Sequence, residues 1–153
     1  MRKINAVYKS VILFGGDGGL GNAIRCKFFD LFTNEVILKS PLKFKINIAN
    51  HYKVDSYLEI LYPGLVANCA AITNVDGCET NEFSAFEVNA LGPKYIAENL
   101  ARQGGTLLHV STDYVFSGTD HTPRKENDPV CPINAYGRTK WAGEVFVRAI
   151  CPK

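Results

Sequence analysis

The chain has 153 residues, of which 46% are hydrophobic and 21% charged, a composition typical of one globular domain with a substantial core. The formal net charge is only +2 and the 17 basic residues are scattered, which argues against a nucleic-acid or membrane-surface partner. Five cysteines without metal-ligand spacing argue against a disulfide framework and a metal site. The apolar run near the N-terminus, residues 11–14, is too short for a signal peptide or membrane span, so we expect a cytoplasmic protein.

A glycine-rich turn follows this first apolar run, which we expect to be a strand. Gly15, Gly18 and Gly21 fit the spacing GxxGxxG. The first permits a tight turn, the second lets the backbone approach a pyrophosphate, and the third lets the following helix pack against the strand. Such a turn can be purely structural, but a strand before it and a helical pattern after it favour nucleotide binding. Asp17 is expected to face solvent, because an acid near a pyrophosphate is repulsive.

The end of the second predicted strand, residues 35–38, bears on the choice of cofactor. An acidic residue there would hold the ribose hydroxyls of NAD, but the sequence has Lys39 and Ser40. A cation and a hydroxyl suit a 2′-phosphate, so NADP(H) is the preferred cofactor and NAD(H) is possible. The alternative is that Lys39 is simply a solvated residue at a strand end.

Strands and helices are expected to alternate along the rest of the chain. The expected elements are a third strand near residues 46–48, a helix at about 54–62, a fourth strand at 65–69, a helical segment at 81–102 kinked or divided at Pro93, and a fifth strand at 107–110. This pattern predicts the α/β class, a doubly wound parallel, Rossmann-like sheet of about five strands ordered 3-2-1-4-5.

Candidate catalytic residues follow the fifth predicted strand. Thr112 lies at its end, where open α/β sheets place their chemistry. Tyr136 and Lys140 are four residues apart in a helical pattern and share one face, and an ammonium beside a phenol favours loss of the phenol proton. A Tyr and a Lys at this spacing also occur by chance on a protein surface. The glycine turn, Thr112 and Asn89, a poor helix former inside a helical segment, favour the catalytic interpretation.

Four segments, NCAAITNVDGCE, VNALGP, HVSTDYVFSG and INAYGRTKWAGE, resemble the extended short-chain dehydrogenase/reductases, specifically the dTDP-4-dehydrorhamnose reductase group. The resemblance implies that Tyr136 protonates a carbonyl oxygen and that Thr112 hydrogen-bonds it. Lys140 would bind the nicotinamide ribose, Asn89 would position Lys140 through water, and Asp113 would contact the sugar.

The motifs and the resemblance together imply a set of cofactor-binding residues: Gly15, Gly18, Gly19, Leu20, Gly21, Lys39, Ser40, Asn47, Ile48, Ala71, Ile72, Thr73, Tyr136 and Lys140. In the family an Asp commonly stands at the position of Asn47, beside the adenine. Asn keeps a hydrogen-bonding side chain there without the charge.

The function that the resemblance implies is an NADP(H)-dependent oxidoreductase that reduces a nucleotide-linked 4-keto-deoxysugar, in dTDP-rhamnose and polysaccharide biosynthesis. The alternative is a non-catalytic, nucleotide-binding regulatory subunit similar to that of methionine adenosyltransferase. Residues 1–153 would form the NAD(P)-binding domain, without the sixth strand and the substrate domain of the family. We therefore expect residues 107–110 to form an apolar sheet edge that self-associates or forms a homodimer, and expect little activity from this chain alone.

Overall fold

The computed structural model describes residues 8–31, 36–43, 45–118 and 122–151. Within these residues the sheet contains four parallel strands in the order β2-β1-β3-β4. The strands are β1 (Ser10–Phe14), β2 (Ile37–Lys39), β3 (Leu65–Asn68) and β4 (Thr106–His109). The predicted α/β class and the relative order of these four strands are confirmed.

The third strand of the prediction, at residues 46–48, is wrong. Here the backbone forms turns: the side chain of Asn47 accepts a hydrogen bond from the N–H of Ala49 at 3.1 Å, and its carbonyl accepts one from the N–H of Asn50 at 3.0 Å. An Asn that bonds to the backbone two residues later offers a local alternative to strand pairing. Asn47 and Ile48 therefore lie in the connection between β2 and the next helix.

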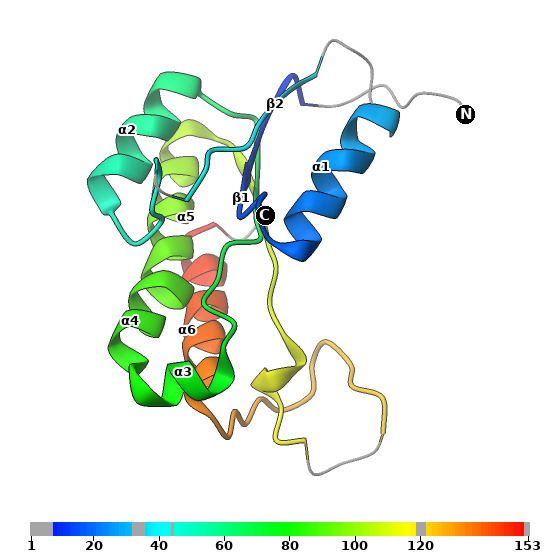
Figure 1. Ribbon diagram of the computed structural model, residues 1–153, viewed down its shortest axis with the longest axis vertical. Coiled ribbons are helices and arrows are strands. Elements are labelled where there is room, and N and C mark those ends of the chain that lie inside the picture. Colours follow the sequence, from blue (N-terminus) through cyan, green and yellow to red (C-terminus); the bar gives the residue numbers. More distant parts are fainter. Residues whose placement is uncertain (1–7, 32–35, 44, 119–121, 152–153) are drawn as a thin grey trace.

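Helices cover both faces of the sheet (Figure 1). Helix α1 (Gly19–Leu31) lies on one face, and α2 (His51–Leu61), α5 (Gly92–Gln103) and α6 (Ala135–Ile150) lie on the other. Alternate residues of β1 serve the two faces, as the pleat of a strand requires. Ile12 and Phe14 join the main core, whereas Val11 packs with Phe28 of α1.

The predicted helical segment at residues 81–102 is built from three pieces. Helix α4 (Glu82–Phe86) leads into a π-helical turn, η1 (Glu87–Leu91), and then into α5, with Pro93 in its first turn. Pro93 has no N–H to give to the carbonyl four residues earlier, which is that of Asn89. That carbonyl instead lies against α6, because a Cβ on Gly143 would come 2.3 Å from its oxygen.

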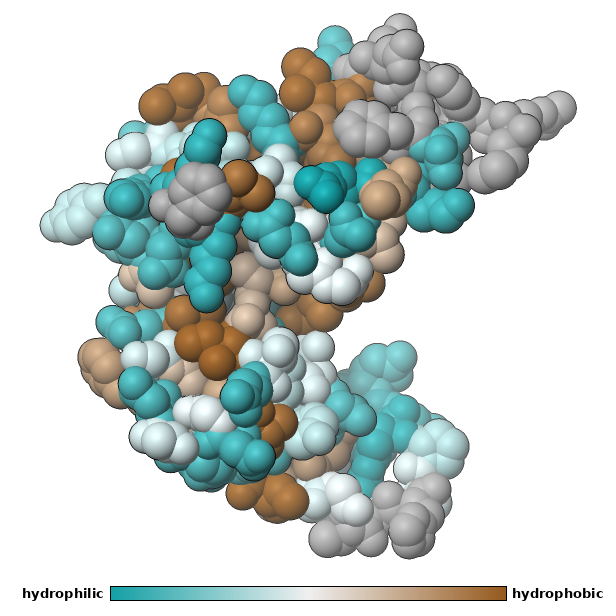
Figure 2. All heavy atoms as spheres, viewed as in Figure 1, coloured by the Kyte–Doolittle hydropathy of each residue, from teal (hydrophilic) through white to brown (hydrophobic). Residues whose placement is uncertain are grey.

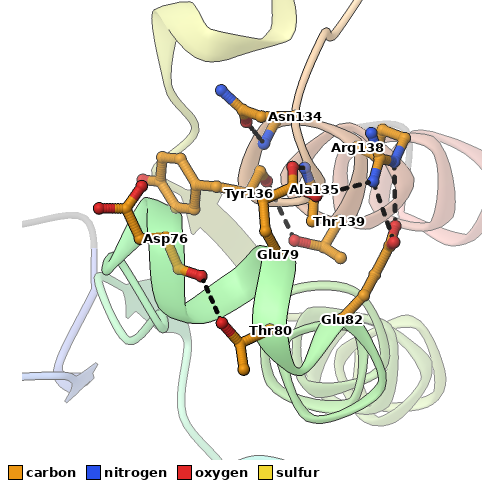
Figure 3. Close-up of polar contacts among 10 residues, drawn as sticks. Asp76, Glu79, Thr80, Glu82, Asn134, Ala135, Tyr136, Arg138 and Thr139 are labelled. Atoms are coloured by element: carbon orange, nitrogen blue, oxygen red, sulfur yellow. Dashed lines mark hydrogen bonds and ion pairs between the residues drawn. The ribbon is translucent and has the colours of Figure 1, made fainter.

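The start of α6 is fixed by side chains from itself and from its neighbours α3 (Val75–Thr80) and α4 (Figure 3). Asn134 caps the helix by accepting from the N–H of Gly137 at 2.8 Å, and Glu79 accepts from the first N–H of the helix. Arg138 pairs with Glu82 through two bonds of 2.9 and 3.0 Å. These contacts set the position of the helix that carries Tyr136 and Lys140. None of the described helices is long and apolar enough to cross a membrane.

Candidate functional site

The glycine turn joins β1 to α1, and its glycines are needed either for close packing within the protein or for access of a ligand to the backbone. Gly15 has a φ of 76°, and a Cβ there would lie 2.5 Å from the backbone nitrogen of Ala70, while a Cβ on Gly21 would lie 2.1 Å from the carbonyl oxygen of Gly15. Packing within the protein therefore requires glycine at both positions. A Cβ on Gly19 would meet no atom within 4 Å, so the backbone at the first turn of α1 is open to an approaching ligand.

A cleft of about 180 Å³ lies beside this turn. Its walls come from the ends of β1 and β3, the connection before α2 and the π turn: Phe14, Gly15, Asp17, Gly18, Pro41, Lys43, Ile46, Asn47, Ile48, Cys69, Ala70, Ala71, Ile72 and Val88. Six of the predicted cofactor-binding residues are brought together here. Gly19, Leu20 and Gly21 lie beside it on α1, and Thr73 is exposed outside its lining.

Two charged residues that were not predicted to bind the cofactor line this cleft. Asp17 is exposed, as expected, but it also lines the cleft. Lys43, which the sequence interpretation did not include, lines the same cleft and brings the opposite charge. The signal in the sequence was a cluster of lysines in the segment KSPLKFK, which begins at the last residue of β2. A cation here favours an anionic ligand.

Lys39 and Ser40 line an adjoining hollow of about 580 Å³, together with Pro41, Leu42, Lys45, Ile46 and Tyr57. Pro41 and Ile46 belong to both hollows, so the two are neighbours. Ser40 packs directly on the glycine turn, because a Cβ on Gly16 would overlap its hydroxyl. The lining of this second hollow contains two lysines and no acidic residue.

Thr112 follows β4 and begins a short 3-10 turn, η2 (Asp113–Val115). Its hydroxyl accepts from the N–H of Tyr114 at 3.3 Å and donates to the carboxylate of Asp113 at 3.2 Å. The turn packs closely on α6, since a Cβ on Gly137 would lie 2.2 Å from the carbonyl oxygen of Tyr114. The space-filling view is hollowed between α1 and the polar loop after η2 (Figure 2).

The ring of Tyr136 is buried to 9% exposure between α6 and its neighbours. It meets the ring of Tyr114 edge-on at 5.5 Å between centroids and belongs to a buried cluster with Cys78, against which Ile72 packs. Figure 3 shows the side chain pointing from α6 toward α3. Ile72 also lines the cleft, so the cluster that contains Tyr136 adjoins one of the cleft walls.

Asn89 is fully buried in the π turn, and its side-chain amide forms hydrogen bonds with two residues. Its side chain pairs with Ile72 through both backbone groups, at 2.8 and 3.0 Å, and donates to the hydroxyl of Thr139 at 3.1 Å. Thr139 in turn donates to the carbonyl of Tyr136 at 3.0 Å. Asn89 therefore joins the cleft wall to the turn of α6 that lies between Tyr136 and Lys140.

Lys140 is almost completely buried, with 2% exposure, and its Nζ donates to the carbonyl of Val110 at 2.6 Å. Burial lowers the pKa of Lys140 to about 8, and the nearby Glu144 and Cys69 oppose this shift. At neutral pH most of Lys140 is still an ammonium, but part of it is a neutral amine.

His109, which the sequence interpretation did not include, lies 3.5 Å from the Nζ of Lys140 through its Nε2. Burial, with a smaller contribution from the positive charge of Lys140, lowers the pKa of His109 to about 3, so its imidazole is neutral. No group of three metal-ligating side chains occurs in the part of the chain that the structure describes.

Comparison with known proteins places this site in a family. The family model described as the RmlD substrate binding domain matches residues 9–153. The chain belongs to this family. Its RmlD-family relatives include a dTDP-4-dehydrorhamnose reductase from Aggregatibacter actinomycetemcomitans, 35% identical over 94% of this chain and 48% of the relative. The spore coat polysaccharide biosynthesis protein SpsK of Bacillus subtilis is 36% identical over 90% of this chain and 48% of its own length.

Solved structures of RmlD-family proteins share the fold of this chain. A dTDP-4-dehydrorhamnose reductase from Clostridium acetobutylicum superposes with a TM-score of 0.88 at 37% identity, over 94% of this chain and 50% of that one. The Bacillus anthracis dTDP-4-dehydrorhamnose reductase, solved in complex with NADP, has a TM-score of 0.87 at 32% identity, over 96% and 51%. This RmlD-family chain thus spans about half the length of these relatives.

Proposed function

We propose that this chain forms the dinucleotide-binding and catalytic half of an NADP(H)-dependent reductase acting on a nucleotide-linked 4-keto-deoxysugar, such as dTDP-4-dehydrorhamnose. The observation that carries the proposal is the position of Tyr136 and Lys140. They lie one turn apart on α6, and the buried cluster that contains Tyr136 packs against Ile72, which lines the cleft beside the glycine turn. A proton donor and a dinucleotide site are then adjacent.

The residues of the cleft and the adjoining hollow fit such a cofactor. The open backbone at Gly19 offers N–H groups of a helix N-terminus to a pyrophosphate. Lys39, Ser40 and Lys45 surround a hollow without acidic residues, which suits a 2′-phosphate. When bound, the reduced nicotinamide supplies the hydride for the carbonyl carbon. The NADP complex of the Bacillus anthracis relative supports this assignment.

The chain itself supplies the proton and the polar contacts. Tyr136 donates its phenolic proton to the carbonyl oxygen as negative charge develops there. The ammonium of Lys140, one turn away, compensates the phenolate that remains. Thr112 donates a hydrogen bond to the same oxygen after its hydroxyl turns away from Asp113, and Asp113 then accepts from a sugar hydroxyl. Asn89 holds the cleft wall and α6 in place.

The proposed activity implies a cellular location and a binding partner. Synthesis of a nucleotide-linked sugar for surface polysaccharides would take place in the cytoplasm. The partner is a nucleotide sugar rather than a nucleic acid, because the small net charge of +2 provides no basic surface.

Replacing Tyr136 by Phe tests the proposal. The Tyr136→Phe variant should keep its affinity for NADPH and lose about 10²- to 10⁴-fold in turnover, the usual contribution of general acid catalysis. Turnover is measured as NADPH oxidation with dTDP-4-dehydrorhamnose, on this chain joined to the C-terminal half of the Aggregatibacter actinomycetemcomitans relative. Tyr52→Phe, at a residue with 83% exposure, is the matched control.

A Tyr136→Phe variant that keeps most of its turnover would contradict the role of Tyr136 as proton donor. If the unmodified joined chain binds NADPH without any turnover, the non-catalytic regulatory subunit becomes the better assignment.

A further inference from the structure

Two polar side chains end neighbouring strands directly beside Lys140. Asn68 is the last residue of β3 and His109 the last of β4, and the parallel register pairs them with each other. Paired residues point to the same face of a sheet. Asn68 is fully buried, so its hydrogen-bonding atoms must find partners within the protein, and the half-buried His109 lies next to it.

The direction of each hydrogen bond can be followed from one fixed donor. The N–H of Ala70 donates to the side chain of Asn68 at 3.1 Å, so the atom it meets must be Oδ1. The other amide atom of Asn68 is then Nδ2, a donor, and it lies 3.2 Å from Nδ1 of His109. Nδ1 must accept this bond and therefore carries no proton. A neutral imidazole has one proton, which leaves it on Nε2.

This Nε2–H lies 3.5 Å from Nζ of Lys140. An ammonium has three donors and no acceptor, so it would meet the imidazole donor to donor. A neutral amine has a lone pair that can accept from Nε2–H while one of its own hydrogens still donates to the carbonyl of Val110 at 2.6 Å. The carbonyl of Val110 accepts a hydrogen bond and the imidazole of His109 donates one. The neutral amine of Lys140 can satisfy both partners, whereas the ammonium can satisfy only the carbonyl.

We infer that Asn68 and His109 are positioning residues that select the protonation state of Lys140: Asn68 fixes the Nε2–H tautomer of His109, and this N–H favours the neutral amine. Two other titratable groups face Lys140 and act in the opposite direction. These are Glu144, one turn later on α6 and hydrogen-bonded by Ser111, and Cys69 after β3. Tyr136 lies one turn earlier on the same helix. The imidazole therefore offsets the acidic groups around Lys140.

The consequence for catalysis rests on the proposed function. Lys140 would then both accept and release a proton near neutral pH, instead of remaining a permanent cation. After Tyr136 has given its proton to the product, the phenolate must be protonated again from its surroundings. The ammonium form of a Lys140 that titrates in the working range can pass a proton to the phenolate and become the neutral amine, which then takes a proton from water, whereas a permanent ammonium supplies charge alone.

Histidine and lysine NMR of the 153-residue chain tests the inference without cofactor or substrate. In ¹⁵N-labelled protein at neutral pH, His109 should have a bare Nδ1 and a protonated Nε2. With ¹³C-labelled lysine, the ε-carbon signal that is lost in Lys140→Met should titrate with a midpoint well below that of the exposed lysines. A protonated Nδ1, or a doubly protonated ring, would overturn the inference.

Asn68→Asp changes the direction of the hydrogen bonds with little change in shape. A carboxylate only accepts, so His109 should move its proton to Nδ1 and turn the Nε2 lone pair toward Lys140. The midpoint of Lys140 should then rise by about one pH unit or more, because the ammonium gains an acceptor and an opposite charge. The change of tautomer separates this effect from charge alone. Asn50→Asp, at the exposed cap of α2, is the matched control.

His109→Gln provides a second variant should Asn68→Asp fail to fold. Its side-chain oxygen can accept from the ammonium, so the midpoint of Lys140 should also rise. A midpoint that stays unchanged in a folded variant would contradict the inference. These measurements need no turnover, so their outcome is independent of whether the reductase proposal succeeds.

Discussion

Lys39 is the residue whose charge bears most directly on the choice between the two dinucleotides. It ends β2 and lines the hollow that also contains Ser40 and Lys45. Lys39→Asp should weaken NADPH binding by about tenfold or more and leave NADH binding unchanged or improved, because a carboxylate repels a 2′-phosphate and accepts from a 2′-hydroxyl. Fluorescence titration with both dinucleotides measures the ratio.

Lys27→Asp makes the same change of charge at an exposed position of α1 and serves as control. Equal affinities of NADPH and NADH for the unmodified chain would rule out a 2′-phosphate site at Lys39.

At the level of single residues, the sequence predicted groups that have a recognisable spacing. The three glycines of the turn and the pair Tyr136 and Lys140 could be found in this way. Asn68 and His109 could not, because each is an isolated polar residue at the end of an apolar strand. Their relation depends on the register of β3 and β4, which places them side by side although they are 41 positions apart. A polar residue ending a buried strand was the only signal.

Helix α1 and the turn before it lead to a prediction at the level of an element, in which two glycines respond differently to the same methyl group. Gly19→Ala should leave stability unchanged or slightly raised, since the space is open and Ala is the better helix former. It should weaken NADPH binding by narrowing the approach to the backbone. Gly21→Ala should destabilise the fold by about 1–3 kcal/mol, because its Cβ would overlap the carbonyl of Gly15.

Urea unfolding and NADPH titration of both variants compare the two effects. A stable Gly19→Ala chain with undiminished NADPH affinity would show that no ligand approaches this turn.

The hydrophobic pattern of the sequence predicted several helices and strands correctly, but it did not predict the structure of two segments. Residues 46–48 have the apolar-polar-apolar pattern of a strand, and a turn formed by the side chain of Asn47 replaces it. The segment around Pro93 is predicted as a helix kinked or divided at that residue, whereas the structure contains a π turn before α5. In both cases a local hydrogen bond, or its absence, prevailed over the hydrophobic pattern.

Strand β4 forms one edge of the described sheet, pairing with β3 alone. Leu108 in its middle has 56% exposure. An apolar edge without Lys or Pro invites pairing with another chain. We predict that the 153-residue chain self-associates through β4 and that Leu108→Lys shifts it toward monomer.

Light scattering with size-exclusion chromatography measures this shift. Ile60→Lys, at an exposed apolar residue of α2, is the control. A monodisperse monomer at high concentration would contradict the prediction.

The whole molecule should lose stability in acid through His109. Its folded pKa of about 3 lies below the ordinary value of 6.5, so the unfolded chain binds the proton first as the pH falls. The stability is fully present above pH 6.5 and is lost progressively toward pH 3, by roughly 3 to 5 kcal/mol for this group.

Urea unfolding between these pH values should therefore show a smaller pH dependence in His109→Gln than in the unmodified chain. His51→Gln, at an exposed histidine, should retain the full dependence. Identical profiles for His109→Gln and the unmodified chain would mean that His109 titrates normally.

The π turn at η1 changes the direction in which the helix faces point before and after it. One additional residue within a helix turns everything after it by about 100° relative to an uninterrupted helix. Before the change of phase, Ala85 faces α6; after it, Ile96 and Leu100 face the sheet. Asn89 lies at the change itself, and its side chain bonds to Ile72 of the cleft wall and to Thr139 of α6. The apolar face of α4 can thus pack on α6 while the apolar face of α5 packs on the sheet. The hydrogen bonds from Asn89 to Ile72 in the cleft wall lie at the turn between these two faces.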